Sequence, residues 1–154
     1  YITPSLNQAR QVAQAGADGI CFDATACPHP DRLPLKEMVR RMHLETGLPL
    51  MADISTLDEG RRAADCGVEM ISTALAGVTP YSRQQMRPDL ELVSELAAHL
   101  AIPVFAEGRY YTPEQALEAL DAGAFAVVVG GAITRPHETT ARFVAALQQR
   151  QQAG

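Results

Sequence analysis

The sequence predicts an α/β fold in which five parallel strands alternate with helices, and an internal repeat is the main evidence. Three segments open with Ser or Thr and close about a dozen residues later at Gly; they are Thr3 to Asp18, Ser55 to Glu69, and Thr112 to Phe125. A short apolar run follows or completes each segment. These runs lack alternating polar residues, which favours strands buried on both faces, as in a parallel sheet. Strands of this kind alternating with helices are typical of the α/β class.

The helices of the repeat carry start and stop signals. Thr112 suits an N-cap, Pro113 the first helical position, and Gln115 completes a capping box, which Thr56 and Glu59 repeat. Each helix is expected to end near a glycine with a left-handed backbone, namely Gly16, Gly67 or Gly123. Three more helices are predicted at 34–45, 89–100 and 138–149.

The five expected strands are the apolar runs Gly19–Phe22, Leu48–Ile54, Met70–Ser72, Ile102–Ala106 and Ala126–Val129. No low-complexity linker interrupts them, so residues 1–154 are interpreted as a single domain.

Composition excludes several functions. The net charge of -5 argues against nucleic-acid binding, which needs a surplus of Lys and Arg. The longest near-apolar stretch, Ala124–Ile133, is far shorter than the ~20 residues that span a bilayer. Three cysteines without a C-x-x-C motif and four scattered histidines indicate no metal site. With no signal peptide evident, a reducing cytoplasm is the expected location.

Polar residues follow each predicted strand at its carboxyl end, which favours a barrel over a doubly wound open sheet. They are Asp23 and Thr25, Asp53 and Ser55, Ser72 and Thr73, Glu107 to Arg109, and Gly130-Gly131. In TIM barrels the active site lies at this end of every strand, whereas an open sheet binds ligands at one switch point. A TIM barrel has eight strands and usually ~200–250 residues. We therefore expect a partial barrel made of strands four to eight, with three βα units before Tyr1, because an open sheet leaves exposed edges.

The last strand predicts a phosphate site. Two glycines at 130 and 131 allow backbone N–H groups to approach an anion, as loops after strands seven and eight often do in barrels. Arg135 is placed to pair with the phosphate. The alternatives are a tight turn without a ligand and a surface arginine.

Two carboxylates at strand ends are candidates for proton transfer. Glu107 suits an acid, a base or a ligand of sugar hydroxyls, or alternatively an ion pair with Arg109. Asp53 is a candidate for the same roles, and its alternative is to cap a helix. Asp23, which lies two residues before Thr25, has the same two possible roles. Together they suit proton transfer on a phosphorylated sugar or another small metabolite.

The loop after the third predicted strand is rich in hydroxyl groups. Thr73, Gly77, Thr79 and Tyr81 are plausible sugar contacts, with a solvated loop as the alternative.

Several motifs resemble those of N-acetylmannosamine-6-phosphate 2-epimerases along the whole chain. They are Asp23-Ala-Thr, the segment Leu50–Leu57, Ser72-Thr with Pro80-Tyr, the segment Ile102–Arg109, and the segment Ala124–Pro136. The resemblance implies a TIM barrel that inverts C2 of N-acetylmannosamine 6-phosphate to give N-acetylglucosamine 6-phosphate in sialic acid catabolism. A proton is removed and returned through an enolate-type intermediate. No redox or metal cofactor is implied, and a complete barrel is expected to form a homodimer.

The resemblance also implies roles for individual residues. Glu107 matches the catalytic glutamate and Asp53 an aspartate that orients the substrate. The phosphate end comprises Gly108, Gly130, Gly131 and Arg135, and further substrate contacts are expected at Asp23, Thr25, Thr73, Tyr81 and Arg109. The proposed base of the family is a lysine of the third strand, which is expected before Tyr1. The single lysine here, Lys36, lies in a predicted helix and cannot replace it.

This sequence departs from the family pattern in three places: Cys27 and His29 where arginines are usual, the Ala74, Ala76 and Val78 series, and Tyr110 in place of an aliphatic residue. Two alternatives therefore stay open. One is an inactive fragment or half of a split barrel, and the other is a different phosphate-binding barrel, such as a thiazole- or indole-pathway synthase.

Overall fold

Five parallel strands form one sheet in chain order in the computed structural model, which describes residues 2–152. The strands are β1 (Ile20–Asp23), β2 (Leu50–Asp53), β3 (Met70–Ser72), β4 (Val104–Glu107) and β5 (Ala126–Val128). All five predicted strands are confirmed. The second and fourth begin two residues later than predicted, after Pro49 and Pro103, which have no N–H to donate to a neighbouring strand.

The helices also occur where they were predicted, with one addition. They are α1 (Leu6–Gln14), α2 (Leu35–Thr46), α3 (Leu57–Asp65), α4 (Leu90–His99), α5 (Pro113–Asp121), α6 (Gly131–Thr134) and α7 (Pro136–Gln152). No helix was predicted directly after Gly130-Gly131, where a tight turn was one alternative. Gly130 is instead the N-cap of α6, and its carbonyl accepts hydrogen bonds from the backbone N–H groups of Ile133 and Thr134.

The capping signals are confirmed at the second and third repeats. Thr56 and Thr112 each form a complete capping box. In the first repeat the N-cap is Ser5 rather than a residue of the Thr3-Pro4 pair. The three glycines that follow these helices have φ angles of 89°, 91° and 99° at Gly16, Gly67 and Gly123, which is left-handed backbone that favours glycine.

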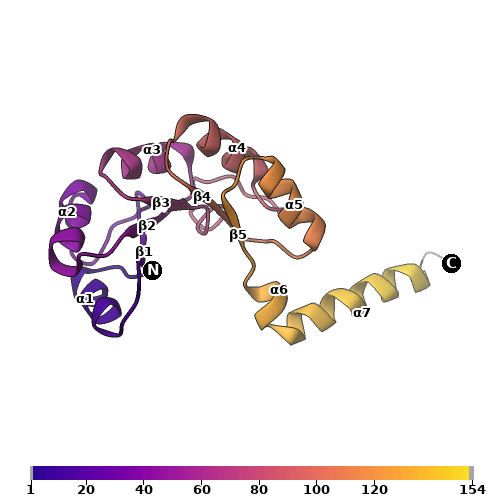
Figure 1. Cartoon of the computed structure of the whole chain (residues 1–154). Coiled ribbons are helices and arrows are strands. Elements are labelled where there is room, and N and C mark those ends of the chain that lie inside the picture. The colour runs from indigo at the N-terminus through magenta and orange to yellow at the C-terminus, as the bar shows by residue number, and fades with distance from the viewer. Residues whose placement is uncertain (1, 153–154) are drawn as a thin grey trace.

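The two faces of the sheet have different environments. Residues such as Ile20, Phe22, Leu50, Ala52 and Ile71 point outward and are fully buried with the helices. Figure 1 shows the sheet as an arc with α1 to α5 on its outer side.

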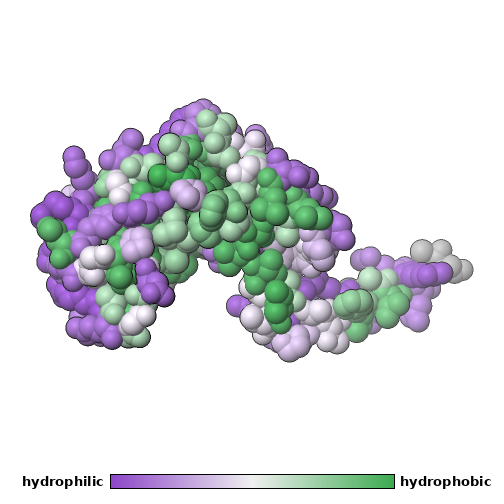
Figure 2. All heavy atoms as spheres, viewed as in Figure 1, coloured by the Kyte–Doolittle hydropathy of each residue, from purple (hydrophilic) through white to green (hydrophobic). Residues whose placement is uncertain are grey.

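The alternate residues of the strands face the inner side of the arc. There the expectation of burial on both faces was wrong, because no element within residues 2–152 covers this side, and Cys21 and Val128 are exposed. Figure 2 shows hydrophobic residues along the inner side of the arc.

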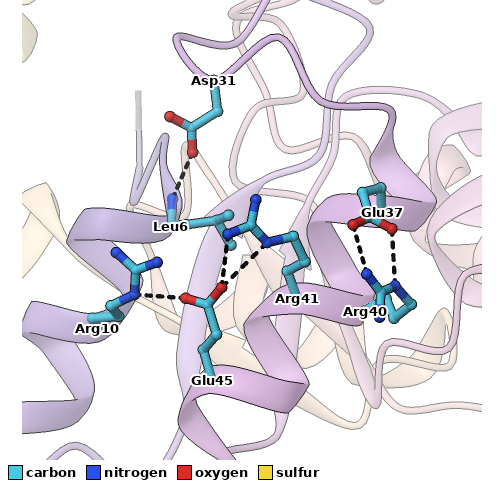
Figure 3. A network of polar contacts seen from close by, with 7 residues as sticks. All are labelled: Leu6, Arg10, Asp31, Glu37, Arg40, Arg41 and Glu45. Atoms are coloured by element: carbon cyan, nitrogen blue, oxygen red, sulfur yellow. Dashed lines mark hydrogen bonds and ion pairs between the residues drawn. The ribbon is translucent and has the colours of Figure 1, made fainter.

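Polar contacts join α1 to α2 at the start of the arc (Figure 3). Glu45 accepts from Arg10 at 2.6 Å and from Arg41 at 3.0 Å, and the Asp31 carboxylate accepts from the Leu6 backbone N–H at 2.7 Å. The two arginine pairs are partly exposed, so their contribution to stability is small.

Candidate active site

Four polar side chains meet at the carboxyl end of the sheet: Asp23, Asp53, Ser72 and Glu107. The first three are directly paired in the parallel register, Asp23 with Asp53 and Asp53 with Ser72, so they point to the same side. Ser72 Oγ donates to Glu107 Oε2 at 2.9 Å and accepts from the Ala74 backbone N–H at 3.2 Å. The structure therefore brings together both predicted catalytic carboxylates, with a serine between them.

The Asp53 carboxyl has a strongly raised pKa. Its exposed fraction is 2%, and burial raises its pKa to about 7, with the Glu107 and Asp23 charges adding to the rise and the neighbouring Ser72 hydroxyl opposing it. A carboxyl with this pKa exchanges its proton near neutral pH, which is the property of a general acid or base.

Cys21 faces the same inner side. Although Cys21 is exposed, the surrounding protein partly desolvates its thiol and, together with the nearby Asp53 and Glu107 charges, raises its pKa to about 11. Cys21 is therefore a neutral thiol beside the carboxylates. Within residues 2–152, His, Cys, Asp and Glu side chains form no group of three or more that could hold a metal ion.

Thr73, predicted to contact a sugar, is 2% exposed and holds the Glu107 backbone. Its hydroxyl donates to the Glu107 carbonyl and accepts from the Glu107 N–H, both at 2.9 Å. Thr25 similarly donates to Asp23 Oδ1 from its N–H at 2.9 Å and its hydroxyl at 2.7 Å. Both threonines orient the acidic residues, and their contact with a substrate stays a prediction.

Arg109 does not pair with Glu107 in the structure. Its guanidinium donates to the Ala76 carbonyl at 2.6 Å and to the Arg87 carbonyl at 3.0 Å, so it binds the loop that follows β3. Gly108 and Arg109 have φ angles of 102° and 63°, a turn that aims this side chain across the sheet end. A Cβ added at Gly77 would displace the guanidinium, and the φ angle of 76° at this position favours glycine.

Tyr81 belongs to a network around Glu59 that sequence reasoning missed. Glu59 is 1% exposed and accepts from the Tyr81 hydroxyl at 2.7 Å, the Ala26 N–H at 2.7 Å and the Ser55 hydroxyl at 2.7 Å. These bonds join the loops that follow β1, β2 and β3. The sequence predicted only one role for Glu59, as the second residue of a capping box. Its hydrogen bonds to Ala26 and Tyr81 were not predicted, because these residues are distant from Glu59 in the sequence.

The predicted phosphate residues lie at the other end of the arc. Gly130 and Gly131 open α6, and an added Cβ at Gly130 would meet nothing within 4 Å, so space around this backbone is open. Arg135 is exposed and forms an ion pair with Glu138 at 2.9 Å. The structure does not bring Gly130 and Asp53 together through any direct contact, and the phosphate site stays a prediction.

Comparison with known proteins supports the resemblance noted in the sequence. The model of one protein family, described as "Putative N-acetylmannosamine-6-phosphate epimerase", matches residues 1–149. The chain belongs to this family. A putative N-acetylmannosamine-6-phosphate 2-epimerase of Caldanaerobacter subterraneus is 46% identical over 97% of the chain, and one of Cutibacterium acnes is 43% identical over 96%.

Solved structures agree with the family assignment. The N-acetylmannosamine-6-phosphate 2-epimerase of Clostridium perfringens superposes with a TM-score of 0.90 at 44% identity, covering 95% of the chain. Mandelate oxidase superposes with a TM-score of 0.66 at 24% identity, and thiamine phosphate pyrophosphorylase of Pyrococcus furiosus with 0.59 at 18%. At these identities the last two show the fold alone. The five strands match TIM-barrel structures over part of their length.

The chain spans about 64% of the length of the Caldanaerobacter relative and 63% of the Clostridium structure. Among the helices described here, none has the length and apolar character needed to cross a membrane.

Proposed function

We propose that this chain carries the acid–base half of an active site that inverts C2 of N-acetylmannosamine 6-phosphate. The observation that supports this most directly is the pair of carboxylates at the ends of β2 and β4, Asp53 and Glu107, on either side of Ser72 at the end of β3. C2 inversion needs a proton removed from one face of the carbon and returned to the other. A carboxyl whose pKa lies near neutrality, Asp53, beside a second carboxylate, Glu107, suits that exchange.

Each carboxylate has a role that follows from its setting. Glu107 is half-buried, and Ser72 orients its carboxylate from one side, so its other oxygen is available to the substrate carbon or its N-acetyl group. Asp53 is deeper and holds its proton up to about pH 7, so it serves as a hydrogen-bond donor that stabilises an enolate oxygen. Backbone N–H groups of Gly108, Gly130 and Gly131, with Arg135, bind the phosphate, and Asp23, Thr25, Thr73, Tyr81 and Arg109 shape the sugar site.

The same proposal assigns residues 1–154 to a partial barrel domain, with the five strands as strands four to eight. Two observations support this assignment. The inner face of the sheet is uncovered, and the chain spans about 64% of the length of the Caldanaerobacter relative. Lys36 lines a cleft on the outer side of the sheet, away from Asp53 and Glu107, and cannot act as their partner. A lysine base is therefore assigned to strands outside this chain.

The test is proton exchange at C2 in D₂O, followed by NMR, with N-acetylmannosamine 6-phosphate as substrate. Two proteins are compared: the 154-residue chain, and the Caldanaerobacter relative in which this chain replaces the matching segment. We expect loss of the C2 proton signal and appearance of the gluco epimer with the chimaera. Glu107→Gln should reduce its rate by roughly 100-fold or more, while Asp58→Asn, at an exposed position, should leave the rate unchanged.

The outcomes separate the remaining alternatives. Exchange by the chain alone would remove the need for a lysine from other strands. Exchange by the chimaera but not by the chain alone would show that the active site needs residues from both this chain and the segment that the relative supplies. A folded chimaera without exchange would contradict the proposed activity and favour the inactive-fragment alternative. The thiazole- or indole-synthase alternative is not retained, because the family match is to the epimerases.

A further inference from the structure

A cleft on the outer side of the sheet has no role in the proposed reaction. Its volume is about 760 Å³, within the range of small-molecule sites. The loop after β1, residues 24–33, forms one wall, and side chains of α2 and α3 form the others. Neither Asp53 nor Glu107 lines it. α1 packs against α2 and α3 against α4, whereas α2 and α3 are in less close contact, and the cleft lies between them.

The charge of this cleft is opposite to that of the chain. Arg32, Lys36 and Arg62 line it with one acidic residue, Asp65, giving three positive charges and one negative, in a protein of net charge -5. Within residues 2–152, none of the three cations forms an ion pair with a carboxylate. Arg62 donates only to the Asp58 backbone carbonyl. Elsewhere on the helical layer the arginines are paired with Glu or Asp, as Figure 3 shows for Arg10, Arg40 and Arg41.

The cations surround a partly apolar interior. Leu33, Leu35 and Ala24 line the cleft together with the thiols of Cys27 and Cys66, which are both half-buried. Burial and the Asp65 charge raise the pKa of the Cys66 thiol, and the charges of Lys36 and Arg62, which line the same cleft, oppose that rise. Burial outweighs them, so the Cys66 thiol is mostly neutral and reacts with alkylating reagents through a small thiolate fraction.

We propose that this cleft between α2 and α3 is a binding site for a phosphate monoester with a small apolar group. A monoester carries a charge of nearly -2 at neutral pH, which matches the surplus of two positive charges. Guanidinium groups bind phosphate oxygens through paired hydrogen bonds, and the leucines and thiols accommodate the apolar part.

The cysteines provide a test that does not depend on enzymatic activity. The 154-residue chain is labelled with N-ethylmaleimide, and the modification rate of each cysteine is followed by peptide mass spectrometry with inorganic phosphate as the probe. Potassium chloride at equal ionic strength is the reference. Bound phosphate shields Cys66 and neutralises the charges that favour its thiolate, so labelling slows by about tenfold at a concentration about ten times Kd. Cys27 should be protected in the same way, and Cys21, on the inner face, should not.

Two neighbouring arginines supply the matched control. Arg61 and Arg62 are both exposed on α3, but only Arg62 lines this cleft. Protection of Cys66 should persist in Arg61→Gln and disappear in the Lys36→Gln/Arg62→Gln double variant, whose circular dichroism is compared with the parent chain. Equal labelling rates with phosphate and with chloride would overturn the proposal, and so would protection that survives in a folded double variant.

Discussion

Residues 6–119 and residues 120–151 belong to the same succession of strands and helices, but their side chains are buried to very different extents. In the first region Phe22 is completely buried, together with Met38, Leu50, Ile71 and others. After Ala119 no side chain that the structure describes is buried, and Phe143 is 69% exposed. The difference does not follow from composition, because both regions contain apolar residues at helical spacing.

The C-terminal helix α7 illustrates what this teaches. Phe143 and Val144 lie four and three residues before Leu147, so each is a neighbour of Leu147 on the helix surface. That face is largely uncovered within residues 2–152, where α7 packs mainly against α6 and Arg142 lies 4.6 Å from the Tyr111 ring centroid. Local sequence is sufficient to form the helix, whereas burial depends on which elements surround it. The expected homodimer would be one way to cover this face, and it stays a prediction.

The largest expected effect compares one phenylalanine from each region. Phe22→Ala should destabilise the fold by about 3–5 kcal/mol, since it leaves a cavity beneath the helices. Phe143→Ala should change stability by less than about 0.5 kcal/mol, because the side chain is mostly in water already. Urea denaturation followed by circular dichroism measures both.

The stability of a helix face that is covered by a second copy of the chain depends on protein concentration. Repeating the Phe143→Ala measurement at two concentrations tests whether a second copy covers α7. A loss of stability as large as that of Phe22→Ala at every concentration would show that α7 packs into the core, contrary to the exposure described here.

A smaller effect concerns Asp53 and depends on pH. Its pKa is raised from 3.8 to about 7 in the folded chain, so the folded state keeps a proton that the unfolded state has released. Stability contributed at this position is therefore lost as pH rises from about 4 to about 7. Asp53→Asn, which mimics the protonated acid, should match the parent chain near pH 4 and be more stable by roughly 2–4 kcal/mol at pH 8.

The measurement is the difference in unfolding free energy between Asp53→Asn and the parent chain across this pH range. Asp58→Asn is the matched control, because the Asp58 side chain is 87% exposed. A difference that does not vary with pH would contradict the raised pKa of Asp53.

The smallest expected effect lies where the two regions meet. Tyr110 is 4% exposed beside Val93 and Ala119, and its hydroxyl has no hydrogen-bond partner within residues 2–152. A buried hydroxyl without a partner costs free energy, so Tyr110→Phe should stabilise the chain by about 1 kcal/mol. Tyr111→Phe, at an exposed neighbour, is the control for thermal denaturation. A destabilised Tyr110→Phe variant would indicate a partner that the described residues do not supply.

Much of the fold could be predicted because its signals are local. Thr56 and Thr112 form the capping boxes that their spacing indicated, and Gly16, Gly67 and Gly123 adopt the left-handed backbone expected of them. Runs such as Ala126–Val128 were identified as strands because they lie between such signals. The short helix α6 was missed because two glycines favour a turn as readily as a helix start.

The candidate site was predictable only in part. Strand-end position selected Asp53 and Glu107, since parallel strands end at the same edge of a sheet. Position alone did not indicate that Ser72 joins the two carboxylates, or that Arg109 turns away to the loop carbonyls. Those contacts connect residues more than 30 positions apart along the chain.

By itself, the sequence determined the class of the fold, its five strands, and the residues that lie at their carboxyl ends, because caps, glycines and apolar runs act over a few neighbouring residues. Only the tertiary structure decided which hydroxyl holds which carboxylate, how far burial raises the pKa of Asp53, and where unpaired cations gather between α2 and α3. Burial and charge at one residue depend on segments distant in the chain, and their positions are set by the packing of the whole sheet and its helices.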